Sequence, residues 1–327
     1  MVRCLSALIA VLSFLIAFPP VASSQKSTGE TADASLTPPL GSLGGHVFIP
    51  SSYIKDPFVR TFFRTGLGFG MTPEMVAPSV TIDSTPVVGS RGSLLFAVLD
   101  VEYQQAIRSW IAVRFRLHTL GRMADETPAL IAQGVTLVSG FEFTWLFRLA
   151  ESDRLTLSGS LGLQNSSVTD VYLQRFIEGI IQEGEITKAN QLVQTTPTLR
   201  FGGGAHGAYA ISTLTGLTFS GELEYGEQID RSAPDKLYYR LAAAFDFDLG
   251  HDGGTPIGFV VGASTRTSPE TETGTDNSSQ TFFGRVAYTG NRNFALGLDL
   301  SYSLTPIRGM SEKQAFASAV VDIRLYF

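Results

Sequence analysis

The last stretch of the chain, Gln314 to Phe327, reads QAFASAVVDIRLYF. From Ala317 onward every second residue is apolar, and Asp322 and Arg324 fall between the apolar positions. Alternation with a period of two over more than ten residues indicates a β-strand with one apolar face and one polar face. A tilted strand of about 9–11 residues is long enough to cross a bilayer. The stretch therefore predicts a membrane-spanning strand.

This terminus resembles the closing strand of bacterial outer-membrane β-barrel proteins, which typically end in Phe after alternating apolar residues. The resemblance implies an all-β fold, a transmembrane antiparallel up-and-down β-barrel, with Phe327 as the signal read by the barrel-assembly machinery. It also implies the outer membrane of a Gram-negative bacterium, with outer-membrane lipid and lipopolysaccharide around the barrel. It does not identify a solute.

The first 24 residues have the pattern of a signal peptide. Arg3 precedes an apolar run from Leu5 to Phe18, and small residues at 22–24 offer a cleavage site before Gln25. The apolar run is shorter than the roughly 20 residues that a helical span needs. Cys4, the single cysteine of the chain, lies in this leader, so we expect a mature protein without disulfides or cysteine-based metal sites.

The composition limits the classes of partner. The chain is 44% hydrophobic and carries 24 Lys and Arg against 30 Asp and Glu, for a net charge of −6. Without an excess or a cluster of basic residues, binding to nucleic acid is not expected. After the leader no run of 18 uncharged apolar residues occurs. Membrane insertion then requires a closed barrel, because only helices and closed barrels satisfy the backbone in lipid.

Period-two alternation recurs along the chain and predicts about twelve strands, each with an apolar face and a face of charged or small polar residues. An even number of strands places both ends of the barrel on the same, periplasmic side. The predicted strands are 64–71, 93–104, 110–120, 134–148, 155–164, 196–212, 217–225, 237–249, 257–267, 281–289, 294–304 and 314–327.

The connections and the aromatic residues support this topology. Connections on the predicted periplasmic side are short, whereas those on the other side include the long segments 72–92, 121–133, 165–195 and 268–280. Outer-membrane barrels show this asymmetry. Aromatic residues such as Trp145 and Tyr225 fall at the two ends of the predicted strands, as expected for residues at the two membrane interfaces.

The segment before the barrel divides into two parts. Residues 25–57 are predicted to be a disordered linker that includes a periplasmic or plug segment, and residues 58–327 form the barrel. The Ser, Thr, Gly and Pro residues of 25–45 carry no periodicity. His46 to Phe63 differs, because Asp56-Pro57 resembles the start of a short helix tucked under or into the barrel. The alternative is a first strand that starts at Phe58. Both interpretations stay open.

The polar faces of the strands predict a charged barrel interior with nine acids and nine arginines. These residues either line a path for a small polar or amphipathic solute, or fill a narrow lumen with ion pairs and hold a structural or surface-binding barrel shut. The lining set is Asp100, Glu102, Arg114, Arg116, Glu142, Arg200, Glu222, Glu224, Arg240, Asp246, Asp248, Arg266, Asp299 and Arg324.

The connection 165–195 is predicted to contain an amphipathic helix. Its apolar residues recur at helical spacing, and Thr169 or Asp170 would cap its first turn. Such a helix would narrow the mouth of the barrel, or it would pack on neighbouring loops or at the lipid surface. The apolar face consists of Leu173, Phe176, Ile177, Ile180 and Ile181.

Neither a catalytic site nor a cofactor or metal site is predicted. His118 and His206 fall on the inward face, which does not match the lipid-facing Ser/His pair of outer-membrane phospholipases. A protease resembling the omptins would use His118 with loop acids such as Asp125 or Glu126, but spacing alone is weak support and a hydrogen-bonded lumenal histidine is favoured. The acidic loop 268–279 is interpreted as solvated rather than as a cation site.

Overall fold

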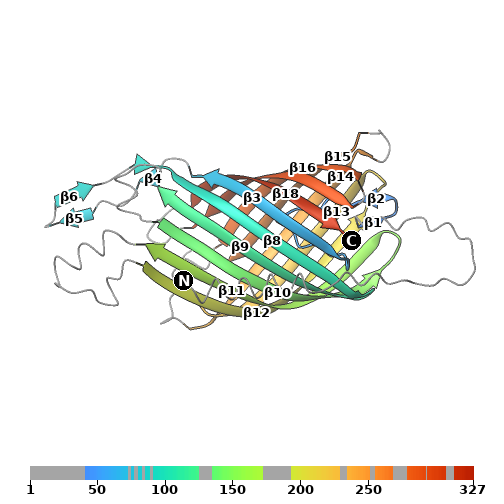
Figure 1. Ribbon diagram of the computed structural model, residues 1–327, viewed down its shortest axis with the longest axis horizontal. Coiled ribbons are helices and arrows are strands. Elements are labelled where there is room, and N and C mark those ends of the chain that lie inside the picture. Colours follow the sequence, from blue (N-terminus) through green and yellow to red (C-terminus); the bar gives the residue numbers. More distant parts are fainter. Residues whose placement is uncertain are drawn as a thin grey trace, which may run out of the picture. The chain divides into compact units, whose positions relative to one another are not determined.

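The structure is a computed structural model that describes residues 41–72, 75–76, 80–82, 85–88, 91–124, 135–171, 193–228, 234–250, 255–267, 278–291, 293–306 and 313–327. Within these ranges twelve antiparallel strands form a closed barrel (Figure 1). Each barrel strand pairs with the next one along the chain, and the last strand closes on the first. The strands are β3 (Phe62–Met71), β8 (Leu94–Arg108), β9 (Ile111–Ala124), β10 (Val135–Glu151), β11 (Leu155–Val171), β12 (Val193–Ala210), β13 (Thr215–Gly226), β14 (Lys236–Asp248), β15 (Ile257–Thr267), β16 (Ser278–Asn291), β17 (Phe294–Thr305) and β18 (Gln314–Tyr326).

All twelve predicted strands are confirmed, but several are longer than predicted. The clearest case is β11, which was expected to end at Gln164 and continues to Val171 through unbroken pairing with β12. Alternation fades in this polar stretch, but the neighbouring strand still supplies hydrogen-bonding partners. Thr169 and Asp170 therefore lie within a strand, and their prediction as helix caps is wrong. The predicted helix itself falls in 172–192, outside the described residues.

The two faces of the barrel differ as the alternation predicts. Outward-facing side chains are large, apolar and exposed, among them Phe69, Leu161 and Val261, which are 72%, 61% and 60% exposed. Their neighbours in sequence on the same strands face inward. Among the described residues, no helix is long and apolar enough to cross a membrane. The apolar exterior and the closed sheet are those of a membrane-spanning β-barrel.

The two ends of the barrel also differ. At one end, adjacent strands are joined by short turns, such as 109–110 and 152–154. At the other end, the connection after β3 extends beyond the barrel as two short strand pairs (Figure 1). These pairs are formed by β4 (Met75–Val76) with β7 (Arg91–Gly92) and by β5 (Val80–Ile82) with β6 (Thr85–Val88). This is the asymmetry that the sequence predicts.

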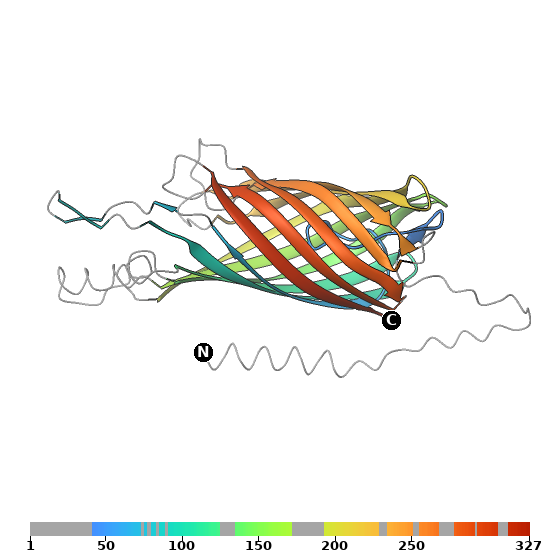
Figure 2. The same ribbon diagram turned by 90° about the horizontal axis from the view of Figure 1, so that it is seen from above.

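Residues 41–61, here called the inner segment, precede the first barrel strand. The segment starts with a hairpin of β1 (Ser42–Leu43) and β2 (His46–Val47), whose turn holds Gly44 and Gly45 at φ values of 56° and 85°. Beyond β2 the chain loops within the barrel at the end that carries the short turns (Figure 2). Residues 48–61 contain neither helix nor strand.

The short helix expected to start at Asp56 is not formed. Asp56 does accept a hydrogen bond from the Phe58 amide at 3.0 Å, as a helix cap would. The following carbonyl groups, however, are bound by the barrel wall. Ser158 donates to the Pro57 carbonyl at 2.5 Å, and Gln104 donates to those of Phe58 and Arg60 at 2.9 Å each. Because β3 begins at Phe62, the alternative strand start at Phe58 is also too early.

The inner segment packs closely against part of the wall. Ile49 and Ile54 belong to one buried cluster with small and apolar residues of β14, β15 and β16. Tyr53 stacks on Phe283 with ring centroids 4.9 Å apart. The fit is tight at Gly258, where an added Cβ would lie 1.9 Å from Ile49 Cδ1. The missing side chain at this position therefore makes room for the inner segment.

We expect Gly258→Val to displace the inner segment without opening the barrel, because the added side chain overlaps Ile49 and overpacking costs about 1–3 kcal/mol. Limited proteolysis followed by mass spectrometry would show faster cleavage within 41–61. The matched control is Gly284→Val on β16, where an added Cβ has no contact closer than 3.8 Å. Equal cleavage of the two variants would contradict the packing.

Candidate functional site

A network of buried ion pairs lines the barrel near the seam between β18 and β3. Arg64, which is 1% exposed, donates from Nε to Asp322 at 2.8 Å and from Nη1 to Asp100 at 2.8 Å. Its Nη1 also lies 3.2 Å from Glu102. Arg116 binds Asp100 as a fork, with Nε and Nη2 each 2.8 Å from a carboxylate oxygen. Such two-point pairs fix orientation as well as charge.

The network continues in both directions around the wall. Arg285 Nη1 lies 2.7 Å from Asp299 and 2.6 Å from Asp322, which extends it to β16 and β17. On the other side, Arg114 lies 3.8 Å from Glu102 and 4.0 Å from Glu142, which extends it to β10. Seven adjacent strands, from β16 through the seam to β10, are thus linked by charge.

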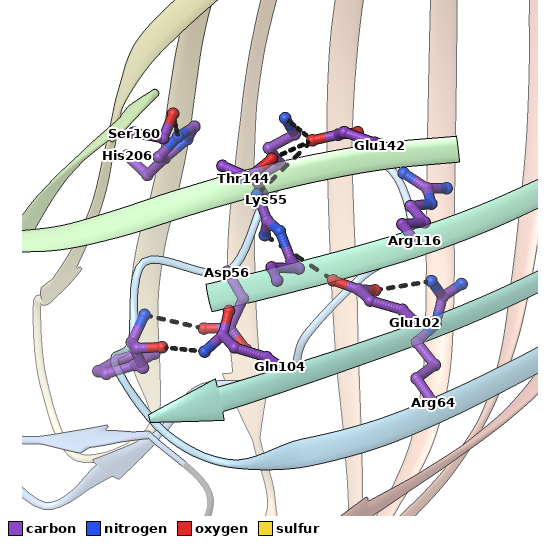
Figure 3. Close-up of polar contacts among 12 residues, drawn as sticks. Lys55, Asp56, Arg64, Glu102, Gln104, Arg116, Glu142, Thr144, Ser160 and His206 are labelled. Atoms are coloured by element: carbon purple, nitrogen blue, oxygen red, sulfur yellow. Dashed lines mark hydrogen bonds and ion pairs between the residues drawn. The ribbon is translucent and has the colours of Figure 1, made fainter. Parts of the chain in front are cut away.

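Lys55 of the inner segment carries this network across the lumen. Its ammonium group pairs with Glu142 on β10 (Figure 3) and also with Glu222 on β13. Thr144 donates to Glu142 at 2.8 Å, and Arg240 lies 3.4 Å from Glu222. One lysine therefore compensates two carboxylates from strands that are not neighbours in the barrel.

Asp56, the next residue, supplies the opposite charge. It pairs with Arg60 and with Arg324, whose Nη1 is 2.9 Å away. Burial alone would raise the pKa of the Asp56 carboxyl group, but the charges of Arg60 and Arg324 outweigh burial and hold this pKa below its ordinary value. Asp56 therefore binds the inner segment to the closing strand as a carboxylate.

Polar contacts also hold the rest of the inner segment. Ser52 and Ser51 donate to Asp299 at 2.8 and 3.3 Å. The Ile49 amide donates to Asp246 at 2.6 Å, and His46 Nε2 lies 3.3 Å from the same carboxylate. The inner segment is thus attached to several sides of the wall.

In the described part of the barrel, two cavities lie beside the inner segment, and the volumes of both include space open to solvent. The first, of about 290 Å³, is bordered by residues of β10 to β13, including Arg200 and Glu224. The second, of about 410 Å³, is bordered by residues 51–56 together with Arg64, Arg116 and Arg324. Lys55 and Glu142 border both cavities, so the ion pair between them lies where the two spaces meet.

The residues predicted to line the lumen have three kinds of position. Asp248 holds the turn after β14 by accepting hydrogen bonds from the Gly250 amide and Thr289. Arg266 is exposed near the end of β15, and Arg116, Arg240 and Glu224 are partly buried. The buried members besides Asp248 are Asp100, Glu102, Arg114, Glu142, Arg200, Glu222, Asp246, Asp299 and Arg324.

Of the other predicted site residues, the structure describes Phe327 but not those of the predicted constriction helix. Phe327 is exposed, and its amide donates to the Thr61 carbonyl at 3.2 Å, so the last residue extends the seam. The proposed constriction residues, from Leu173 to Ile181, fall outside the described residues. Sequence reasoning missed Lys55 and Asp56 as partners of the wall. The sequence did contain a signal that these residues are buried. Residues 46–63 are rich in apolar and aromatic residues, which a solvated linker would not be.

A serine and a histidine also meet beside the first cavity. Ser160 Oγ lies 2.8 Å from His206 Nε2 (Figure 3). Within the described residues, His206 Nδ1 has no hydrogen-bond partner, so the third member of a catalytic triad is not in place. The described part of the chain also holds no group of three His, Cys, Asp or Glu residues arranged for a metal ion. The pair acts as a hydrogen-bonded contact of the wall.

Glycines 202–204 belong to the same wall. They follow the regular register between β11 and β13 without a bulge. A Cβ at Gly202 or Gly204 would lie 2.2 or 2.4 Å from a carbonyl oxygen of β13, so close packing explains these glycines.

Comparison of the whole fold with solved structures places it among known barrels. An outer-membrane channel from Pseudomonas putida F1 superposes with a TM-score of 0.52 at 12% identity, covering 85% of this chain and 99% of that one. The two chains share a fold. A FadL homologue from Pseudomonas aeruginosa (TM-score 0.46, 10% identity, 86% and 95% covered) and the translocator domain of NalP from Neisseria meningitidis (0.48, 10%, 84% and 90%) are also similar. No family model and no curated protein matches the sequence.

We expect Lys55→Met to destabilise the protein by about 3 kcal/mol, because it leaves two buried carboxylates without their shared cation. Urea unfolding in detergent measures the change. The triple variant Lys55→Met/Glu142→Gln/Glu222→Gln removes the uncompensated charge and should recover most of the loss. Wild-type stability in Lys55→Met would show that the ion pair contributes nothing.

The stability conferred by Asp56 should depend on pH in a defined direction. Because its pKa is lowered in the folded protein, the stabilisation is fully present above the unfolded-state value of about 3.9 and is lost as the pH falls through the folded-state value. The difference in melting temperature between wild type and Asp56→Asn should therefore be constant from pH 5 to pH 8 and shrink below about pH 4. Asp153→Asn, in an exposed turn, should show no such trend. A difference that grows on acidification would refute the assignment.

Proposed function

We propose that this protein is a narrow outer-membrane channel or transporter for small polar or amphipathic solutes, with its lumen obstructed by the inner segment in the present conformation. The observation that carries the proposal is the pair of cavities, both bordered by charged side chains, that meet at Lys55. The fold shared with an outer-membrane channel supports it. The lining residues are the charged side chains of the wall described above.

The residues that fill the lumen favour a solute path through the barrel over a permanently closed barrel. Wall positions such as Gly66, Gly68, Gly162 and Gly202 carry no side chains. Part of the interior is instead occupied by the inner segment, which is continuous with the wall only where it enters β3. Lys55 and Asp56 border the second cavity, so water can reach these charged groups when the segment moves, and breaking their ion pairs then costs less than in a dry core.

The connection 172–192 is a second candidate restriction. Its predicted amphipathic helix would narrow the mouth on the side of the long loops, while the inner segment obstructs the lumen nearer the short turns. If the helix forms there, both restrictions act on the same path. A test of the channel must therefore remove each of them separately.

The alternative is a closed structural or surface-binding barrel. It is favoured by the ion pairs of the interior, since the pairs between wall residues join seven strands and those of Lys55 cross the lumen. The alternative predicts that no treatment of the inner segment produces conductance. A hydrolase is less well supported, because the Ser160–His206 pair has no third member in the described residues.

A reversible crosslink tests the proposal. An added Cβ at Gly258 would lie 3.1 Å from Ile49 Cγ1, so cysteines at these two positions are close enough for a disulfide. With Cys4→Ser also present, Ile49→Cys/Gly258→Cys holds the only two thiols. In planar bilayers we expect the reduced form to conduct several times more current than the oxidised form.

The single variant Ile49→Cys is the matched control and should not respond to reductant. Two further variants, one lacking 41–58 and one lacking 172–187, remove the two restrictions. The channel hypothesis would be rejected if no variant, including the reduced double-cysteine protein, showed conductance or solute flux. The closed barrel would then be the remaining interpretation.

A further inference from the structure

The first cavity contains a cation and an anion that do not compensate each other. Arg200 on β12 and Glu224 on β13 both border this space. Its remaining border includes Gly162, Gly202 and Gly203, which add no side chains to the space.

Arg200 is buried, and no carboxylate of the described residues pairs with it. It is 8% exposed, and its guanidinium carbon lies 3.9 Å from the centre of the Tyr238 ring. Its Nε donates to the Glu227 carbonyl at 3.3 Å. Within the described residues, no carboxylate lies within 4.0 Å of this guanidinium group. The ring and the carbonyl therefore orient Arg200 without neutralising it.

Glu224 is in the converse position. The Gln164 amide, with its nitrogen turned toward Glu224, donates to the two carboxylate oxygens at 3.1 and 3.3 Å. Across the described part of the barrel no basic group lies within 4.0 Å of Glu224. It differs in this respect from Glu142 and Glu222, which share the ammonium group of Lys55.

The pairing of β12 with β13 would allow Arg200 and Glu224 to reach each other. Arg200 is paired with Gly226, and Glu224 with Gly202, so the two charged residues occupy diagonal positions on adjacent strands. Diagonal neighbours lie about 7–8 Å apart, within reach of long side chains. They nevertheless do not pair, because each side chain is turned toward its own neutral partner. A bridging molecule can complete both contacts.

From this arrangement we propose that the first cavity binds a small zwitterion, with its carboxylate on Arg200 and its ammonium group on Glu224. The planar fork of arginine matches a carboxylate in two-point geometry. The ammonium group of Lys55, between Glu142 and Glu222, closes the cavity on the side of the inner segment. The inference rests on the proposed function for its role as a solute site, but the binding itself does not require transport.

Isothermal titration of the full-length protein in detergent micelles tests the site. The probes are glycine, β-alanine and γ-aminobutyrate, which separate the two charges by increasing lengths, with n-butylamine and butyrate as single-charge counterparts. We expect at least one zwitterion to bind, and n-butylamine and butyrate to bind at least about tenfold more weakly, the factor that corresponds to one lost charge-assisted hydrogen bond.

Variants locate the binding. Arg200→Gln and Glu224→Gln should each weaken zwitterion binding about tenfold or more. Arg200→Lys keeps the charge and serves as the folded reference. It should also weaken binding, because the two-point geometry of the guanidinium group is lost. The matched controls are Arg148→Gln and Glu151→Gln, which break an ion pair of the same residue types outside the cavity and should leave binding unchanged.

Three results would overturn the site: no zwitterion binds, the single-charge compounds bind equally well, or the control variants weaken binding as much. If a zwitterion binds but no conductance is measured, the binding site stands and the channel hypothesis is rejected. If conductance is measured but no zwitterion binds, the channel hypothesis stands and the binding site is rejected.

Discussion

The closure of the barrel brings two arginines face to face. In the register of β18 on β3, Arg324 lies opposite Arg64, and like charges directly opposite each other destabilise a strand pair. Arg64 is compensated by acids of the wall, namely Asp322, Asp100 and Glu102. Arg324 is compensated by Asp56, which belongs to the inner segment. The charge balance of the seam therefore requires a residue that is not part of the barrel.

This requirement links the inner segment to the fold. Its apolar residues, Ile49, Ile54 and Tyr53, pack on β14 to β16, and each such side chain contributes about 1.5–3 kcal/mol when fully buried. Its charged residues, Lys55 and Asp56, are largely buried together with their partners, so the cost of removing the charges from water offsets much of the attraction and leaves a smaller net gain for each ion pair. The apolar contacts thus supply most of the holding energy, and the charged contacts determine which part of the wall each residue faces.

The sequence predicts the strands well because their signal is local. Alternation identifies a strand and its inward face from a few residues at a time, as in β15, where the predicted and observed bounds agree. The prediction failed where structure depends on a distant partner. β11 continues beyond Gln164 because β12 pairs with it, and the helix at Asp56 does not form because Ser158 and Gln104 bind the carbonyl groups that it would use.

The same distinction applies to the candidate site. Alternation places Asp246 and Asp248 on one face, two residues apart, but one binds the inner segment and the other holds a turn. Lys55 meets Glu142 and Glu222 across the lumen, a meeting that depends on how the whole sheet closes. In an interior with equal numbers of acids and arginines, composition suggests complete compensation. Only the geometry reveals that Arg200 and Glu224, at diagonal positions on adjacent strands, are each held by a neutral partner among the described residues, and the proposed zwitterion site rests on this observation.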